Sequence, residues 1–190
     1  MIKDFVWRAS IMSMIILLLS TSSPGDAHAA YMTDMVVTNT RDNLILFVKV
    51  EGAFTVKMKE AIMNGIPTSF LYFVKVARVR PFFPDQTISS IKLTHTIKYD
   101  NLRKIFTVKR SWEDDRPLTT DSFQEAQSWM SEIKSLPVVP LAELKKGARY
   151  KVKAKTELDK FTLPFYLNYL FFFVSLWDFK TEWHSVDFVY

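Results

Sequence analysis

Histidine, serine and carboxylate side chains are the candidates for chemistry in this chain of 190 residues, because it contains no cysteine. The absence of cysteine excludes disulfides, thiolate metal sites, iron–sulfur clusters and a cysteine nucleophile. The motifs H-E-x-x-H and G-x-S-x-G are also absent. His95 lies on the apolar face of a predicted strand, where a hydrogen-bonded core histidine is the commoner role. The sequence therefore predicts no catalytic residue, no metal site and no cofactor.

An enzyme assembled from scattered residues is the alternative. A hydrolase would need a cleft in which a carboxylate or His184 has a shifted pKa, and one sequence does not reveal such a cleft. The interpretation that we favour is a protein that is not an enzyme.

A basic face on one predicted strand is a candidate interaction surface. Its members alternate along residues 148–158, so that they share one side of the strand: Arg149, Lys151, Lys153 and Lys155. Such a face could attract anionic lipid headgroups, lipopolysaccharide phosphates or an acidic partner. The commoner role is the solvent face of an edge strand, where lysine prevents edge-to-edge pairing. No motif that reads DNA or RNA is present, so nucleic acid is not an expected partner.

A run of aromatic residues near the C-terminus is the second candidate surface. We expect residues 165–177 to form a short helix with one side packed on the domain and some rings partly exposed. The rings that could meet a membrane surface or a partner protein are Phe171, Phe172, Phe173 and Trp177. The alternative is an unusually aromatic core element.

The first 29 residues predict a secretory signal peptide. Lys3 and Arg8 supply the charged start, Ile11–Leu19 supplies the apolar region, and Ala27-His28-Ala29 places cleavage before Ala30. The alternative is an uncleaved anchor, although the apolar run is about half of the roughly 20 residues that spanning requires. An exported chain without cysteine fits the periplasm of a Gram-negative bacterium, with or without peripheral attachment to the membrane.

Alternation of apolar and polar residues predicts strands, which must position these side chains. The predicted strands cover residues 31–40, 44–50, 68–80, 88–99, 104–112, 148–158 and 181–190. The strand that begins at Thr68 is apolar on both faces at its start, which indicates a central position in a sheet. We expect helices near 54–64, ended by Gly65 and Pro67, and near 121–135, ended by Leu136-Pro137.

These elements predict a mainly β fold. We expect an antiparallel β-sandwich of immunoglobulin-like size with two or three short helices in the connections, built as one domain over residues 30–190. A small outer-membrane β-barrel is the alternative. The predicted helix near 121–135 and the strand at Thr68 that is apolar on both faces are not typical of such a barrel.

Two segments carry a resemblance to a known family. The C-terminal pattern is Leu163-Pro164 with an apolar stretch, then residues 177–184 (WDFKTEWH) and Val186-Asp187-Phe188; the earlier pattern is residues 61–67 (AIMNGIP). Together they resemble the bacterial exported family called domain of unknown function 4390. That family has no established activity. Its genes often lie beside a nitrogen-regulation-type sensor kinase, so the resemblance implies at most a role in envelope sensing.

The resemblance also places aromatic residues in the fold, since it implies that Trp177 and Trp183 cover the open end of the sandwich. Taken together, the sequence predicts an exported envelope protein that is not an enzyme and that acts as a binding or accessory module. Its expected partner is a membrane surface or an envelope protein such as a sensor kinase.

Overall fold

The computed structural model describes residues 30–113, 116–159 and 179–190. The elements of this part follow one another as β1 (Tyr31–Asn39), β2 (Asn43–Glu51), α2 (Val56–Met63), β3 (Thr68–Arg78), β4 (Gln86–Asp100), β5 (Ile105–Arg110), β6 (Leu118–Thr120), α3 (Phe123–Ser131), β7 (Glu132–Pro140), β8 (Arg149–Leu158) and β9 (His184–Val189). A short 3-10 turn, Leu141–Glu143, lies between β7 and β8.

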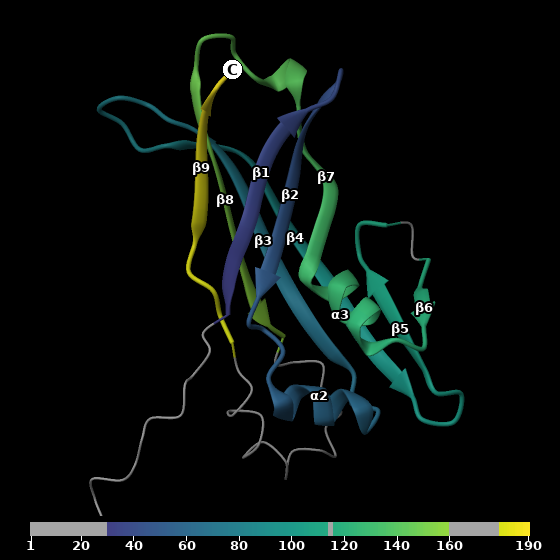
Figure 1. The fold of residues 1–190 in the computed structure, drawn as a ribbon. Coiled ribbons are helices and arrows are strands. Elements are labelled where there is room, and N and C mark those ends of the chain that lie inside the picture. The colour runs from purple at the N-terminus through teal and green to yellow at the C-terminus, as the bar shows by residue number, and fades with distance from the viewer. Residues whose placement is uncertain (1–29, 114–115, 160–178) are drawn as a thin grey trace, which may run out of the picture.

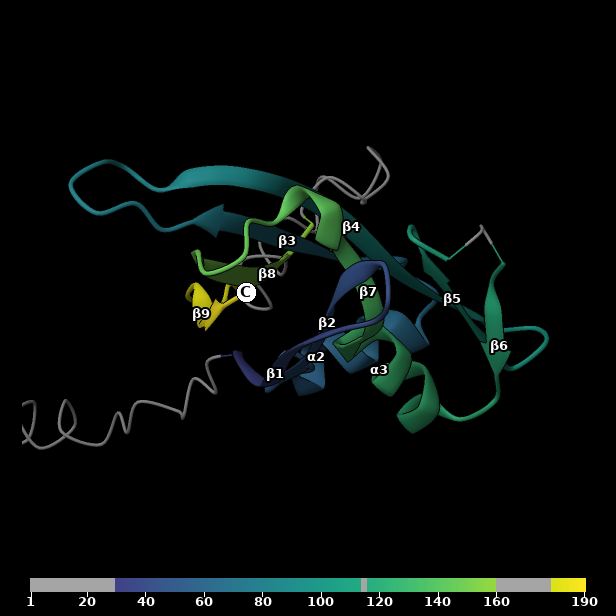
Figure 2. The same ribbon diagram turned by 90° about the horizontal axis from the view of Figure 1, so that it is seen from above.

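The strands form two antiparallel sheets, which confirms the mainly β, sandwich-like fold. One sheet has the order β1-β2-β7 and the other the order β6-β5-β4-β3-β8-β9. The smaller sheet lies across one face of the larger one, with α2 and α3 toward the lower end (Figures 1 and 2). As predicted, β3 is central, since it pairs with β4 on one side and β8 on the other.

The core lies between the two sheets and is built largely from alternate residues of the strands, with side chains of α2 and α3 added to it. On β3 the side chains of Phe70, Tyr72 and Val74 are buried in it, while Phe73 and Lys75 point to the opposite face. The three-stranded sheet contributes Leu46 and Val48 among others. The outer face of the six-stranded sheet is therefore available for side chains that the core does not use.

The helix α2 forms where the sequence predicts it. Its first turn is capped by Thr55, whose Oγ1 accepts a hydrogen bond from the Met58 amide at 3.2 Å. Gly65 ends the helix with φ +83°, a conformation that suits glycine, and Pro67 follows.

The second predicted helix is shorter than its sequence pattern indicates. Helix α3 ends at Ser131, and the chain continues directly into β7, so the prediction of helix as far as residue 135 is wrong. Backbone pairing with β2 causes the switch: Ile133 lies opposite Val48 and Leu136 opposite Leu46, and both side chains are buried. Pro137 fits because β7 is an edge strand of its sheet.

The strand that carries the basic residues is not an edge strand. β8 pairs with β3 and with β9, and β9 forms the edge. The need to protect a free edge therefore does not explain the lysines of β8.

Two predictions lie outside the described residues. These are the signal peptide over residues 1–29 and the aromatic helix over 165–177 with Phe171, Phe172, Phe173 and Trp177. Across the ranges that the structure describes, none of the helices has the length and apolar character needed to cross a bilayer.

Candidate functional site

The outer face of the six-stranded sheet carries a cluster that we call the lysine face. It brings together lysines from three neighbouring strands and two aromatic rings: Lys75, Lys92, Lys153, Lys155, Phe73 and Trp183. The register places them side by side. Phe73 lies opposite Lys92 on β4 and opposite Lys155 on β8, and Lys75 lies directly opposite Lys153.

Aromatic rings hold three of these ammonium groups. The Lys155 Nζ lies 4.5 Å from the centroid of the Phe73 ring and 5.6 Å from that of Trp183. Lys92 approaches Phe73 at 5.7 Å and Lys75 approaches Trp183 at 5.5 Å. Each distance is within the range of a cation–π interaction, which fixes the position of a charge without neutralising it.

The positive charges of the lysine face are only partly balanced. Lys155 donates to Glu157 at 2.9 Å, and the neighbouring Lys151 pairs with Asp187 at 3.7 Å. Across the described ranges of the chain, Lys75, Lys92 and Lys153 have no carboxylate within ion-pair distance. The face thus keeps three ammonium groups available for an anion.

Only part of the predicted basic face of residues 148–158 belongs to the lysine face. Lys153 and Lys155 belong to it, Lys151 lies beside it, and Arg149 is exposed at the start of β8 opposite Val189. Trp183, expected at the end of the sandwich, instead lies over Lys75 and Lys155 on the outer face. Its placement there differs from the one that the family resemblance implied.

The sequence reading missed Lys75, Lys92 and Phe73. These residues come from β3 and β4, far along the chain from β8, and only the strand register shows that they are neighbours. One feature of the sequence pointed to this site: Lys75 is a charged residue that directly follows an apolar run on a strand predicted to be central.

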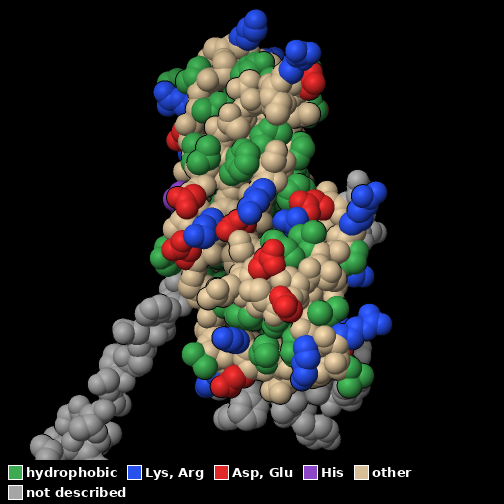
Figure 3. All heavy atoms as spheres, turned by 45° about the vertical axis from the view of Figure 1, so that its right-hand side comes forward, with side chains coloured by type: hydrophobic (Ala, Val, Ile, Leu, Met, Phe, Trp, Pro, Cys, Tyr) green, Lys and Arg blue, Asp and Glu red, His purple; other side chains and the backbone are tan. Residues whose placement is uncertain are grey.

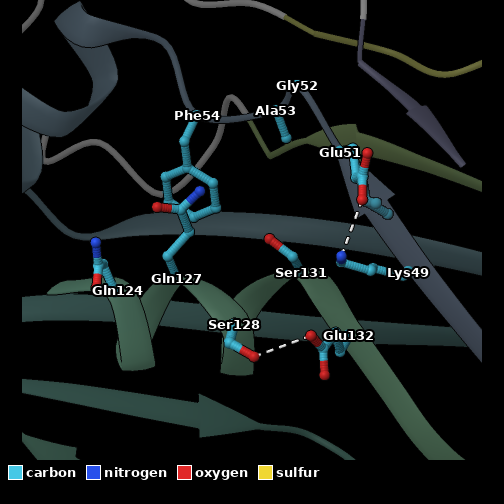
Figure 4. A pocket seen from close by; sticks show the side chains of 11 residues that line it. Lys49, Glu51, Gly52, Ala53, Phe54, Gln124, Gln127, Ser128, Ser131 and Glu132 are labelled. Atoms are coloured by element: carbon cyan, nitrogen blue, oxygen red, sulfur yellow. Dashed lines mark hydrogen bonds and ion pairs between the residues drawn. The ribbon is translucent and has the colours of Figure 1, made fainter. Parts of the chain in front are cut away.

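A pocket of about 430 Å³ lies on the other side of the molecule, between the end of β2 and helix α3 (Figure 4). Gly52, Ala53 and Phe54 form one wall, and α3 presents Gln124 and Gln127 from the opposite wall. Acidic and basic side chains are mixed over the surface in the middle of the view in Figure 3.

The charged groups of this pocket are already paired. Lys49 Nζ donates to Glu51 at 2.9 Å, and Tyr31 Oη donates to the same carboxylate at 3.1 Å. These two hydrogen bonds, that of Lys49 first, lower the pKa of Glu51, and the bond to Glu51 raises the pKa of Lys49. The pair is therefore fully ionised at neutral pH.

Glu132, on the α3 side of the pocket, is held in the same way. Partial burial acts to raise its pKa, but hydrogen bonds from Lys134 and from the Ser128 hydroxyl, both at 2.9 Å, outweigh it and lower the pKa. A general acid at neutral pH needs a raised pKa, so neither Glu51 nor Glu132 is suited to that role.

The two histidines in the described part of the chain, His95 and His184, lie apart from the pocket and from each other. His95 is fully buried in the core and hydrogen-bonded to Met130 and Trp112, which confirms its predicted role as a core histidine. His184 is exposed at the start of β9, opposite Ala154. In the described part of the chain, no group of His, Asp and Glu side chains is arranged to hold a metal ion.

Comparison with known proteins gives one match. No curated protein and no solved structure matches the chain. The sequence model of a family described as domain of unknown function (DUF4390) matches residues 27–187, which is most of the chain. The 61–67 pattern falls within the match, and so does the C-terminal pattern except for its last residue, Phe188. The chain therefore belongs to the DUF4390 family.

Proposed function

We propose that the protein is a non-catalytic binding module of the bacterial cell envelope, and that its lysine face binds a phosphate-bearing anion. In this proposal the signal peptide of residues 1–29 directs export to the periplasm. The observation that carries the proposal is the direct opposition of Lys75 and Lys153 across β3 and β8. Like charges in directly opposed positions destabilise a sheet, and a bound anion turns this repulsion into attraction.

The ligand class follows from the donors on the lysine face. An ammonium group is a compact point charge with three donors, and lysine is a common ligand of phosphate. Phe73 and Trp183 hold the neighbouring ammonium groups in place, so an anion meets positioned charges. A phosphate group is available on lipid headgroups and on free polyphosphate, and the lysine face suits both sources.

The non-catalytic assignment rests on the pocket. Its carboxylates are ionised and paired, and neither His95 nor His184 lines it. The family resemblance supplies the wider setting of the proposal, which is envelope sensing next to a membrane-bound sensor kinase.

The test measures binding of the mature chain to short-chain polyphosphate and to phosphatidylglycerol vesicles. We expect Lys75→Gln/Lys153→Gln to weaken binding at least about ten-fold, because two of the unpaired charges are lost. The matched control is Lys57→Gln/Lys104→Gln, which removes two exposed charges, one on α2 and one in the turn between β4 and β5, that are not part of the lysine face. Binding to polyphosphate alone identifies a free phosphate ligand, and vesicle binding that the lysine-face variant loses identifies a headgroup.

A stability measurement separates a binding role from simple loss of charge. Lys153→Glu replaces the repulsion with Lys75 by attraction, so we expect the free energy of unfolding to rise by about 0.2–1 kcal/mol while phosphate binding is lost. If the parent and Lys75→Gln/Lys153→Gln bind both polyphosphate and the vesicles equally well, the proposal is disproved. An absence of binding to both probes would disprove it too.

A further inference from the structure

The β3–β4 hairpin extends beyond the rest of the sheet and ends in two exposed aromatic residues. Figures 1 and 2 both show its tip projecting from the body of the molecule. At the tip, Phe82 is 102% exposed and Phe83 is 69% exposed. Among the described residues, no other large hydrophobic side chain is as exposed as that of Phe82. In the sequence, the two phenylalanines lie between Pro81 and Pro84.

Side-chain hydrogen bonds fix the conformation of the tip, in which the rings of Phe82 and Phe83 point into solvent. The Arg80 guanidinium donates from Nε and Nη2 to the Pro84 carbonyl, at 3.0 and 2.7 Å. At the last residue pair of the β3–β4 ladder before the loop, Arg78 Nη2 donates to Gln86 Oε1 at 2.9 Å. Phe82 has φ +67°, an uncommon conformation for a bulky residue, so the chain bears both backbone strain and exposed apolar surface here.

Basic residues gather at the base of this hairpin. The Val79 amide donates to the Arg149 carbonyl at 2.9 Å, which places the start of β8 beside the hairpin. Lys145 and Lys146, both exposed, come just before that point in the chain. The space-filling view shows blue Lys and Arg side chains at this upper end of the molecule (Figure 3). The acidic residues in the adjoining segments are Asp85, Glu143 and Asp42, the last placed there by the hydrogen bond from the Leu141 amide to the Asp42 carbonyl at 2.8 Å.

We propose that the β3–β4 hairpin docks the protein on an anionic lipid bilayer, with Phe82 and Phe83 inserted at the level of the headgroups. Aromatic rings at a loop tip gain by leaving water for the boundary of the acyl chains. Basic side chains behind them then lie where the lipid phosphates are, and each is attracted to an anionic surface. The order along the hairpin, apolar at the tip and basic behind it, matches the order of layers in a bilayer.

This docking is separate from the proposed phosphate binding on the lysine face. It uses different residues, at the end of the sheet and not on its outer surface. The two proposals can therefore fail independently.

The test compares sedimentation of the mature chain with vesicles of phosphatidylethanolamine and phosphatidylglycerol against vesicles of phosphatidylcholine alone. We expect the double variant Phe82→Ser/Phe83→Ser to lower the partition coefficient on anionic vesicles at least about ten-fold, since both rings must stay in water. Polyphosphate binding should be unchanged in that variant. Arg149→Gln/Lys145→Gln should weaken binding to anionic vesicles and leave the weak binding to phosphatidylcholine as it is.

Leu102→Ser is the matched control. Leu102 is 95% exposed in the turn between β4 and β5, so the change removes an equally open apolar side chain from another hairpin. Circular dichroism of each variant checks that the fold is retained. Equal vesicle binding by the parent and the tip variant overturns the proposal, and so does failure of the parent to bind anionic vesicles, which would leave the tip to a protein partner.

Discussion

His95 is kept as a neutral ring in the core by two hydrogen bonds of opposite sense. Trp112 Nε1 donates to His95 Nε2 at 3.2 Å, so the proton of the ring is on Nδ1, which lies 3.1 Å from the Met130 carbonyl. Tyr72 Oη donates to the same carbonyl at 2.6 Å. Burial raises the pKa of Tyr72, so it stays a donor. Two side chains thus satisfy a carbonyl at the end of α3 that the helix leaves unpaired.

The buried ring makes stability depend on pH. Burial, helped by the charge of Arg110 and opposed by the bond to Met130, lowers the pKa of His95 from 6.5 to about 4. Since the unfolded chain takes up a proton first, this contribution is complete above about pH 6.5 and is lost as the pH falls toward 4. Between about pH 7 and pH 5 we expect the free energy of unfolding to fall by about 2 kcal/mol.

Chemical denaturation at a series of pH values measures this loss. His95→Gln should be less stable at pH 7 but should lose most of the pH dependence above pH 5, while His184→Gln, at an exposed position, should keep the slope of the parent. If the slope survives in His95→Gln, another group is responsible.

The roles of single residues could be predicted where they depend on strand alternation. The core position of His95 and the shared face of Lys151, Lys153 and Lys155 both follow from a period of two. The partners of Lys153 could not be predicted, because Lys75 is its neighbour only through the register of β3 and β8. The charge of the site is visible in the sequence, but its shape is not.

At the scale of elements, local signals decide where α2 ends. The Gly65 amide donates to the Ile62 carbonyl at 2.8 Å and the Ile66 amide to the Ala61 carbonyl at 3.1 Å. A side chain at Gly65 would have to adopt φ +83°, and its Cβ would lie 3.3 Å from Asn101 Nδ2. Sequence reasoning recognised this helix end because glycine followed by proline has a local meaning.

Gly65→Ala should therefore destabilise the protein by about 1–2 kcal/mol, through backbone strain. Gly147→Ala is the comparison, since Gly147 has φ +76° but nothing lies within 4 Å of an added Cβ. We expect Gly65→Ala to cost at least as much as Gly147→Ala, and Gly65→Asn to cost less, in thermal or chemical unfolding. A neutral Gly65→Ala would mean that the turn relaxes without cost.

The junction of α3 and β7 shows where local signals fail. The stripe of Phe123, Ala126, Trp129 and Ile133 has helical spacing, and it predicts a helix that continues past Ser131. Instead, Ser135 adopts φ +62° and β7 pairs with β2. The backbone pairing and the burial of Ile133, Leu136 and Val138 outweigh the helical preference of the segment.

At the scale of the whole molecule, the two sheets share a single buried cluster. Leu46 from the three-stranded sheet and Ile97 from the six-stranded sheet are both fully buried in it, with Met130 of α3. The sequence predicted two layers, because alternating strands need a second apolar face to cover them. It could not divide the strands between the layers, since that division depends on which edges pair.

A shared cluster has a consequence for unfolding. Neither sheet can keep its buried face covered when the other separates. We therefore expect unfolding to be one cooperative transition, with the same midpoint whether it is monitored by far-UV circular dichroism or by tryptophan fluorescence. Leu46→Ala and Ile97→Ala, one in each sheet, should each lower the free energy of unfolding by about 2–5 kcal/mol. Both probes should shift together in both variants, because each change weakens the same core. Two separate transitions, or a Leu46→Ala shift seen by only one probe, would show that the smaller sheet unfolds on its own.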